Sequence, residues 1–390
     1  MSSSKKGKKP SPFIVFDIGS ASIGAAILVF DEETEKINIL YDTRVYIAFQ
    51  EKFFKDKHLT AATISALKKA VQNIQDKGIR RVHESNIKDV FCIIGSPWYE
   101  AEIKNIKFIE DEPFTVSSKF ISKILDEEGE KFEASKGKLM EKNIIQVLLN
   151  GYSTDNPYGK EASVVDTTLF FSSVSDDLQK RIKDVLEASF IVSDVSFNTF
   201  ALTSFSAVRD IFKTEKSFLL MDISGETTDI ILVRDETIKK VASFRLGKNF
   251  LIRKVASSLS TVHEEAHSLI RLFIDEKSTD SESAKIEPVL KEAKEEWLSY
   301  LRKILSDFSE GISLPKTVLL SVDTDLSKWF VDTIKNDEFS SHTLAEESFT
   351  VVELSSRILN EYCTMPEDSP RGCDPFLVLG AIFVHKIANE

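Results

Sequence analysis

The chain carries one short pattern twice, as Asp17-Ile18-Gly19-Ser20 near its start and as Asp222-Ile223-Ser224-Gly225 past its middle. Each copy follows an apolar stretch, at residues 13–16 and 218–223, and each opens into a second apolar stretch. This is typical of two β-strands joined by a tight turn, because Gly and Ser suit the turn and apolar residues suit the strands. Two such hairpins indicate a duplicated fold in which each half contributes one hairpin to a shared cleft.

The pattern around each hairpin is also repeated. A third apolar stretch follows at residues 37–48 in the first half and at 238–245 in the second, so each half is predicted to begin with a three-stranded meander. Apolar residues at helical spacing predict a helix over residues 59–77 with Gly78 as its C-terminal cap. A last helix is predicted over residues 375–388.

A unit with a different rhythm lies between the hairpins. Strands are predicted at residues 103–109, 144–150 and 164–172, with an amphipathic helix at 119–132 after the first of them. Trp98 and Tyr99 stand where this unit would join the first half and are predicted to form a packed junction. The predicted domains are a disordered basic tail at 1–10, a first domain at 11–97, 176–215 and 375–390, an inserted subdomain at 98–175 and a second domain at 216–374.

Composition excludes some classes of function. The 390 residues with 42% hydrophobic content suffice for two cores. A net charge of −12 argues against a nucleic-acid binder, which needs a basic surface. No apolar run approaches the roughly 20 residues that span a bilayer, so any membrane role is expected to be peripheral. The odd number of cysteines, Cys92, Cys363 and Cys373, without a CxxC pair indicates reduced thiols and a cytoplasmic protein.

The two hairpins have residues suited to a phosphate and a cation. Backbone amides and small hydroxyls in such turns form an anion-binding concavity. An Asp at the end of each strand is placed to hold Mg²⁺ through water, since this ion prefers oxygen ligands. A plain turn is the alternative for either copy alone, and the matching contexts of the two copies favour the shared site. The residues concerned are Asp17, Gly19, Ser20 and Ser22 in the first hairpin and Asp222, Gly225, Thr227, Thr228 and Asp229 in the second.

The two motifs together resemble those of the actin-like ATPases. The first phosphate motif of that superfamily resembles Phe16-Asp17-Ile18-Gly19-Ser20-Ala21-Ser22, and the second resembles Met221-Asp222-Ile223-Ser224-Gly225-Glu226-Thr227-Thr228-Asp229. Residues 144–152 and 156–160 resemble the inserted subdomain of the bacterial division protein FtsA and the pilus protein PilM. Residues 244–249 and Gly380 in the last helix also fit, so the resemblance covers nearly the whole chain after residue 11.

This resemblance implies an α/β protein with two actin-like, ribonuclease H-like domains, a central nucleotide cleft and an inserted small α/β subdomain. It implies ATP and Mg²⁺ as cofactors, with Mg²⁺ held through water by Asp17 and Asp222. The implied role is an FtsA-like scaffold that joins a membrane-associated assembly to the division machinery and is at most a slow ATPase. The implied nucleotide-binding residues are Asp17, Gly19, Ser20, Ser22, Asp222, Ser224, Gly225, Thr227, Thr228 and Gly247.

A PilM-like pilus assembly protein that binds the cytoplasmic peptide of a membrane partner is the alternative. FtsA ends in a linker and a membrane-targeting helix, whereas this sequence ends at Ala388-Asn389-Glu390 directly after the last predicted helix. Both readings imply self-association into filaments or oligomers, protein partners at the inserted subdomain, no nucleic acid, and a cytoplasmic location at the inner face of the cell membrane.

Two segments depart from the family pattern. Ser224 and Glu226 stand where the second motif usually has glycines, and a carboxylate beside a phosphate is unfavourable unless a cation or an outward rotamer relieves it. The glycine-rich adenosine loop is replaced by Ser321-Val322-Asp323-Thr324-Asp325. These changes leave ATP hydrolysis without an identifiable general base.

A third hypothesis comes from another class of protein. His263-Glu264-Glu265-Ala266-His267 matches H-E-x-x-H, in which two histidines one helical turn apart bind zinc and the Glu acts as base in a metallopeptidase. The competing interpretation is an ordinary helix start, with Thr261 and Glu264 as a capping box. The sequence shows no third zinc ligand.

Overall fold

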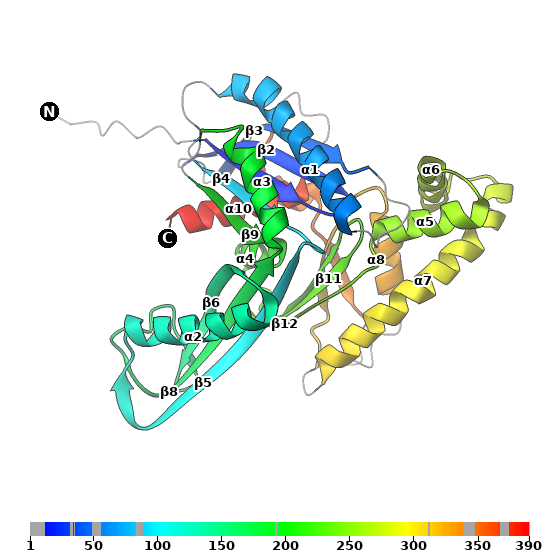
Figure 1. The fold of residues 1–390 in the computed structure, drawn as a ribbon. Helices are drawn as coiled ribbons and strands as arrows, with labels where there is room; N and C mark the ends of the chain where they lie inside the picture. The colour runs from blue at the N-terminus through cyan, green and yellow to red at the C-terminus, as the bar shows by residue number, and fades with distance from the viewer. Residues whose placement is uncertain are drawn as a thin grey trace.

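The computed structural model of the chain forms three β-sheets with helices packed on them (Figure 1). It describes residues 12–31, 34, 36–48, 56–82, 87, 89–191, 194–310, 313–337, 348–366 and 374–389. The predicted disordered tail, residues 1–10, lies outside these ranges. Across the described ranges, none of the helices combines the length and the apolar character needed to cross a membrane.

The first sheet is built around the first hairpin. Three of its strands form the predicted antiparallel meander, and two more extend the sheet in parallel beside the first strand. A short strand near the end of the chain pairs with the outer strand of the meander. In spatial order the strands are β15 (Cys363–Thr364), β3 (Lys36–Tyr46), β2 (Ser22–Asp31), β1 (Phe13–Ile18), β4 (Val90–Ile94) and β9 (Val195–Thr199).

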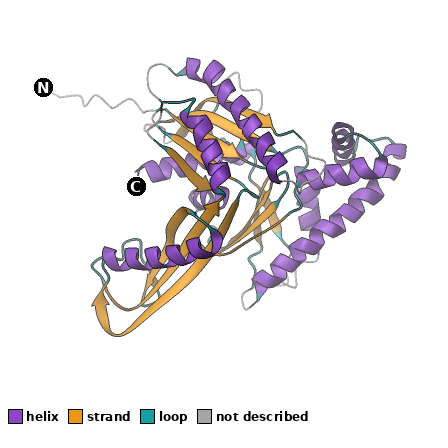
Figure 2. Ribbon diagram, viewed as in Figure 1, coloured by secondary structure: helices purple, strands orange, loops and turns teal. Residues whose placement is uncertain are grey.

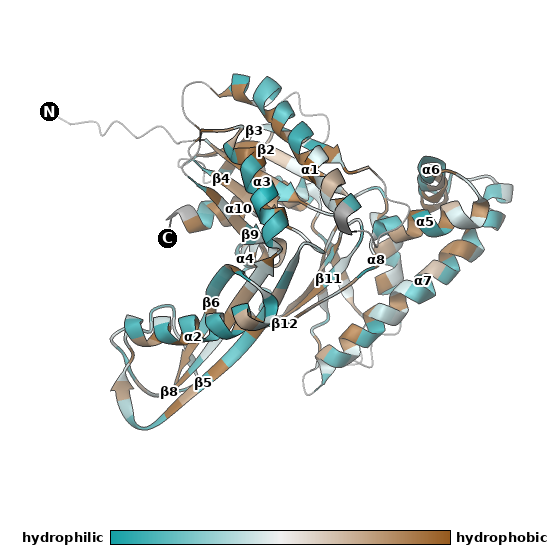
Figure 3. Ribbon diagram, viewed as in Figure 1, coloured by the Kyte–Doolittle hydropathy of each residue, from teal (hydrophilic) through white to brown (hydrophobic). Residues whose placement is uncertain are grey.

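Helices cover both faces of this sheet (Figure 2). One pair packs together on one face, namely α1 (Asp56–Asn73) and α3 (Asp176–Glu187), and another pair on the other face, namely α4 (Phe200–Ile211) and α10 (Pro375–Asn389). The outer side of α3 is hydrophilic in Figure 3. Its inner side buries apolar residues at helical spacing, as expected for a helix on a sheet: Leu178, Ile182 and Leu186.

The predicted cap at Gly78 is wrong. Helix α1 ends at Asn73, and the chain continues as a π-helical turn (Ile74–Gly78) and a 3₁₀ turn (Ile79–Arg81). Gly78 is buried, and a Cβ atom there would lie 2.9 Å from atoms of both Ile27 and Tyr41. The residue is therefore glycine because the turn packs closely on the sheet.

The second sheet repeats the plan of the first. Its order is β12 (Thr237–Phe244), β11 (Thr228–Arg234), β10 (Phe218–Ile223), β13 (Thr317–Val322) and β14 (Thr350–Glu353). As in the first sheet, the strand before the hairpin pairs antiparallel with the strand after it and parallel with a later strand. The duplication predicted from the two hairpins is confirmed in the topology. The helices of this half are α5 (Lys248–Leu259), α6 (His263–Ile274), α7 (Asp280–Ser309) and α8 (Ser327–Lys335), whereas the short α9 (Ser356–Leu359) packs against α10 of the first half.

The third sheet belongs to the unit between the hairpins. Its order is β5 (Tyr99–Thr115), β8 (Glu161–Val174), β6 (Leu139–Leu149) and β7 (Tyr152–Ser153), and α2 (Ser118–Lys136) packs on it. The predicted strands and helix are all present, and β5 and β8 extend well beyond their predicted ends. Figure 1 shows this sheet projecting from the rest of the molecule.

Six of the described helices and strands were not predicted from the sequence, namely β7, β9, α8, β14, α9 and β15. The expectation of reduced thiols is also wrong at one position, because Cys363 is disulfide-bonded. Cys92 is a free, buried cysteine, and burial raises the pKa of its thiol. Residues 363–364, expected in the second domain, pair with β3 of the first sheet.

Candidate functional site

The two hairpin turns have the same backbone geometry. In the first, the amide of Gly19 donates to the carbonyl of Ser22 at 3.1 Å, and in the second the amide of Ser224 donates to the carbonyl of Thr227 at 3.0 Å. Each turn follows a strand that lies in the interior of its sheet. Both predicted turns are therefore present, one in each half.

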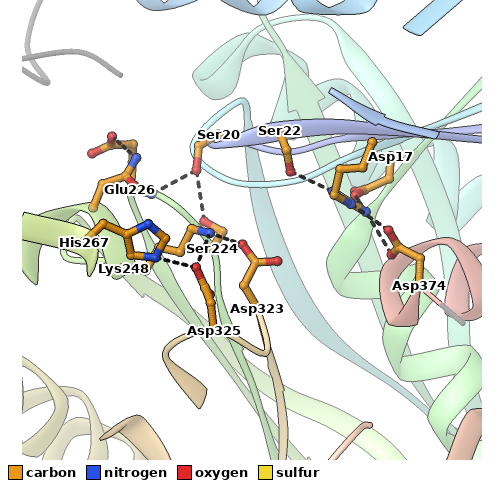
Figure 4. Close-up of polar contacts among 12 residues, drawn as sticks. Asp17, Ser20, Ser22, Ser224, Glu226, Lys248, His267, Asp323, Asp325 and Asp374 are labelled. Atoms are coloured by element: carbon orange, nitrogen blue, oxygen red, sulfur yellow. Dashed lines mark hydrogen bonds and ion pairs between the residues drawn. The ribbon is translucent and has the colours of Figure 1, made fainter. Parts of the chain in front are cut away.

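The tips of the two turns contact each other directly (Figure 4). The hydroxyl oxygens of Ser20 and Ser224 lie 3.1 Å apart, and the amide of Glu226 donates to Ser20 Oγ at 3.0 Å. A Cβ atom at Gly225 would lie 2.3 Å from the Cβ atom of Ala21. Groups expected to face a phosphate thus bind the opposite hairpin.

Arg44 lies on the carboxylate expected to hold the cation. Its Nη2 donates to Asp17 Oδ2 at 2.8 Å and its Nη1 to Ser22 Oγ at 2.7 Å. On its other side, Nε and Nη2 donate to the two carboxylate oxygens of Asp374 at 2.6 and 2.9 Å. Gly24 leaves the space for this group, since a Cβ atom there would lie 2.7 Å from Arg44 Nη2.

These charges are buried. Burial raises the pKa of Asp17 to about 6, although the charge of Arg44 opposes this shift. Burial disfavours the charge on Arg44, but Asp374 and Asp17 together hold the pKa of its guanidinium well above the usual range. The guanidinium is therefore permanently charged and compensates two carboxylates at once.

The second hairpin has two buried carboxyl groups that lack such a partner. Asp222 Oδ1 and Asp229 Oδ1 have no hydrogen-bond partner in the part of the chain that the structure describes. Burial, reinforced by the charges of Asp229 and Asp17, raises the pKa of Asp222 well above its usual range. Burial also raises the pKa of Asp229 to about 7. Burial therefore favours the neutral form of both groups.

The carboxylate of Glu226 does not lie beside the expected phosphate position. It accepts hydrogen bonds from Asn249 Nδ2 at 2.8 Å and from Arg253 Nη1 and Nη2 at 3.0 and 2.5 Å. Both partners belong to α5, which packs behind the hairpin. The repulsion expected between Glu226 and a phosphate is thus removed by an ion pair within the second half.

The acidic segment in place of a glycine-rich loop is also paired. Lys248 at the start of α5 contacts the carboxylate of Asp323 and lies 3.8 Å from Asp325. His267 Nε2 lies 2.7 Å from Asp325 Oδ2. Although burial acts in the opposite direction, the hydrogen bond from His267 and the charge of Lys248 lower the pKa of Asp325.

The zinc hypothesis finds no support in this arrangement. Over the described ranges, the structure has no group of three or more His, Cys, Asp or Glu side chains placed to hold a metal ion. His267 of the H-E-x-x-H segment pairs with Asp325 instead. The predicted capping box is wrong, because Val262 precedes the helix without a side-chain cap and Thr261 binds Glu265 rather than Glu264.

The remaining predicted site residues, Thr227, Thr228 and Gly247, make contacts within the second half. Thr228 Oγ1 donates to the carbonyl of Leu246 at 2.8 Å and accepts from Trp297 Nε1 at 3.2 Å. Thr227 Oγ1 lies 2.9 Å from Ser224 Oγ. A Cβ atom at Gly247 would lie 2.4 Å from the carbonyl oxygen of Ser224, so a side chain there would separate α5 from the hairpin.

A magnesium-bound triphosphate does not fit these residues in this conformation. The cavity bordered by Asp17, Ser20, Asp222 and Ser224 has a volume of about 30 Å³, which is on the order of one water molecule. Magnesium usually keeps several of its waters and would need more space. A larger pocket of about 580 Å³ adjoins it, bordered by Tyr46, α5, α6 and the Asp323 to Asp325 segment. Its size is that of a small-molecule site.

Sequence reasoning missed the arginine at the cleft, Arg44, and its partner Asp374. Arg44 and Asp374 are 330 positions apart, and no local pattern marks either of them. The prediction that Trp98 lies at a packed junction is confirmed. The Nε1 atom of Trp98 donates to the carbonyl of Gly19 at 3.2 Å. The start of the third sheet is therefore attached to the first hairpin.

No family model matches the sequence, and no curated protein matches it either. Among solved structures, PilM in the PilM–PilN type IV pilus biogenesis complex is similar with a TM-score of 0.59 at 12% identity, over 96% of this chain and 98% of that one. MreB 5 of Spiroplasma citri bound to AMPPNP has a TM-score of 0.47 at 12% identity, over 97% of each chain. The ethanolamine utilization protein EutJ from Carboxydothermus hydrogenoformans has a TM-score of 0.42 at 12% identity, over 96% of this chain and 90% of that one. The chain has the fold of the actin-like ATPase superfamily and is similar in fold to PilM.

Proposed function

We propose that this protein is an actin-fold adaptor that binds an extended segment of a membrane partner in a groove between its first and third sheets. The observation that carries this proposal is a groove of about 780 Å³ bordered by β9, α3 and the first half of β6. The groove lies outside the cleft between the hairpins and shares no residue with it.

Two strand edges contribute to the groove. β9 is the last strand of the first sheet and, among the described residues, pairs only with β4. β6 pairs with β8 on one side, and β7 covers its other side only at Leu148 and Leu149. Strand edges with unpaired backbone groups bind extended peptides by adding a strand, so this groove is suited to a peptide rather than to a folded domain.

Glu141 fixes the two walls of the groove relative to each other. Its carboxylate accepts from Ser172 Oγ at 2.8 Å within the third sheet. It also accepts from the amide of Thr199 at 2.9 Å and from Asn198 Nδ2 at 3.1 Å, both at the end of β9. A groove with fixed walls loses less entropy on binding a partner than one that must first be assembled.

The similarity to PilM supports the pilus-type role over the division role of FtsA. PilM is the partner of PilN in the complex named above, and we propose an equivalent pairing for this chain, through which it reaches the membrane indirectly. Self-association and the domain bounds predicted from the sequence remain part of this proposal. ATP binding remains a prediction, for which the 580 Å³ pocket is the available space.

Filling the groove is expected to abolish partner binding. Ser196 is an exposed residue of β9 that lines the groove, so Ser196→Trp places an indole where the peptide would lie. The probe is a fluorescent peptide that spans the cytoplasmic segment of the membrane protein encoded next to this chain's gene. We expect Ser196→Trp to weaken its binding by about tenfold or more in fluorescence anisotropy.

Ser306→Trp is the matched control. Ser306 is exposed on α7, outside the groove, and the same substitution there is expected to leave the affinity unchanged. Equal binding by wild type and Ser196→Trp would contradict the proposed site. A wild-type protein that fails to bind the peptide would contradict the proposed partner.

A further inference from the structure

We propose that Arg44 is the built-in cation of the cleft, so that the two hairpins stay closed without a magnesium–nucleotide complex. This inference goes beyond the adaptor function and concerns a different part of the molecule. It rests on the position of one guanidinium group, on the socket that holds it and on the charges around it.

The guanidinium of Arg44 lies beside the carboxylate of Asp17 at the end of β1, where the sequence predicted a magnesium ion. Through two edges of its planar group it binds Asp17, the predicted magnesium residue, and a second carboxylate, Asp374. It also donates to Ser22, one of the predicted phosphate-binding residues. A single group thus satisfies the carboxylate and the hydroxyl for which the sequence predicted a metal and a phosphate.

The chain provides a complete socket for this group. Gly24 leaves room beside Nη2, and the ring of Phe376 lies with its centre 5.2 Å from the Arg44 Cζ atom. The side chain of Arg44 is only 10% exposed. Planar geometry, two carboxylate partners and an aromatic neighbour are the features that suit arginine and that lysine does not reproduce.

Two further cations near the cleft, Lys248 and Arg253, already have partners within the second half. Lys248 pairs with Asp323 and Asp325, and Arg253 pairs with Glu226. A triphosphate would bring several negative charges to a place where these cations already have partners. It would also have to separate Ser20 from Ser224.

The same arginine ties the first hairpin to the last helix. Asp374 Oδ1 accepts from the amides of Phe376 and Leu377 at 3.1 and 3.3 Å, so this carboxylate caps α10 while it binds Arg44. Displacement of Arg44 by a metal would therefore leave the cap of α10 without its counter-charge. Figure 4 shows Asp17 and Asp374 facing each other across the group that joins them.

The test on the wild-type, full-length protein compares ATP binding by calorimetry with magnesium and with EDTA. We expect magnesium to change the ATP affinity by less than about twofold, whereas coupled ligands usually change each other's affinity by about fivefold or more. Absence of ATP binding both with magnesium and with EDTA would also agree with the proposal. An affinity that rises about tenfold with magnesium, with the gain lost in Asp17→Ala, would overturn the proposal.

A second arm uses magnesium alone as the probe. In Arg44→Met the carboxylates of Asp17 and Asp374 lose their counter-charge, so magnesium without nucleotide is expected to raise the melting temperature of this variant but not that of wild type. Arg181→Met, at an exposed ion pair on α3, is the control and is expected to behave as wild type. The same magnesium response in wild type and Arg44→Met would overturn the proposal, and the wild-type calorimetry decides the matter if the variant does not fold.

Discussion

Replacement of Arg44 by alanine is expected to lower the free energy of unfolding by about 3–5 kcal/mol, because it leaves two buried carboxylates without their counter-charge. Asp17 and Asp374 have side-chain exposures of 6% and 15%, so water compensates them poorly. The midpoint of urea unfolding, followed by circular dichroism, measures the effect.

Arg181→Ala is the matched control for this loss. Arg181 pairs with Asp177 on the outer side of α3, where both side chains are largely exposed, and pairs of this kind contribute about 0–1 kcal/mol. A loss in Arg44→Ala no larger than that in Arg181→Ala would show that the guanidinium is not needed to hold the closed cleft.

Asp229→Asn is expected to change the pH dependence of stability. Burial raises the pKa of Asp229 in the folded protein from 3.8 to about 7. The stability associated with its neutral form is therefore fully present below the unfolded pKa and is lost as the pH rises through the folded pKa. Between about pH 4 and about pH 8, Asp229→Asn is expected to gain about 2–4 kcal/mol relative to wild type.

Urea unfolding of both proteins across this pH range measures the difference. Asp194→Asn provides a control of opposite sign, because the amide of Val195 and the charge of Lys183 lower the pKa of Asp194. That variant is expected to lose stability relative to wild type as the pH rises. A constant difference between Asp229→Asn and wild type at all pH values would contradict the burial of an ionisable group at this position.

The sequence predicts the hairpins well because their signals are local. Asp17 and Asp222 each end a buried apolar strand and precede small residues, and this pattern requires no knowledge of the rest of the chain. The duplicated order of strands follows from the same signals. β9 was missed because Val195-Ser196-Phe197-Asn198-Thr199 is short and partly polar, and its place at the sheet edge depends on the neighbouring β4.

The chemistry of the cleft could not be predicted in the same way. An Asp at a strand end is compatible with a magnesium ion and with an arginine, and only the tertiary structure brings Arg44 to Asp17. Glu226 similarly carries no local sign that Arg253, one turn into α5, will bind it. The residues that distinguish a nucleotide site from an internally paired cleft therefore lie outside the motifs.

The closed cleft and the partner groove are consistent with one role for the molecule. Ion pairs neutralise charges within each half, and direct contact between the hairpins joins the two halves without a ligand. A fixed body of this kind suits a scaffold, which must present the groove beside β9 in one geometry. It is less suited to a motor, which requires a cleft that responds to its nucleotide.

The most direct test of an internally neutralised cleft is a crystal structure of the protein grown with AMPPNP and Mn²⁺, with the metal located by its anomalous signal. The account predicts no metal between Asp17 and Asp222, with Arg44 still bound to Asp17 and Asp374 and Ser20 still in contact with Ser224. A Mn²⁺ ion at Asp17 that bridges to the nucleotide phosphates, with Arg44 displaced and the hairpins apart, would contradict it.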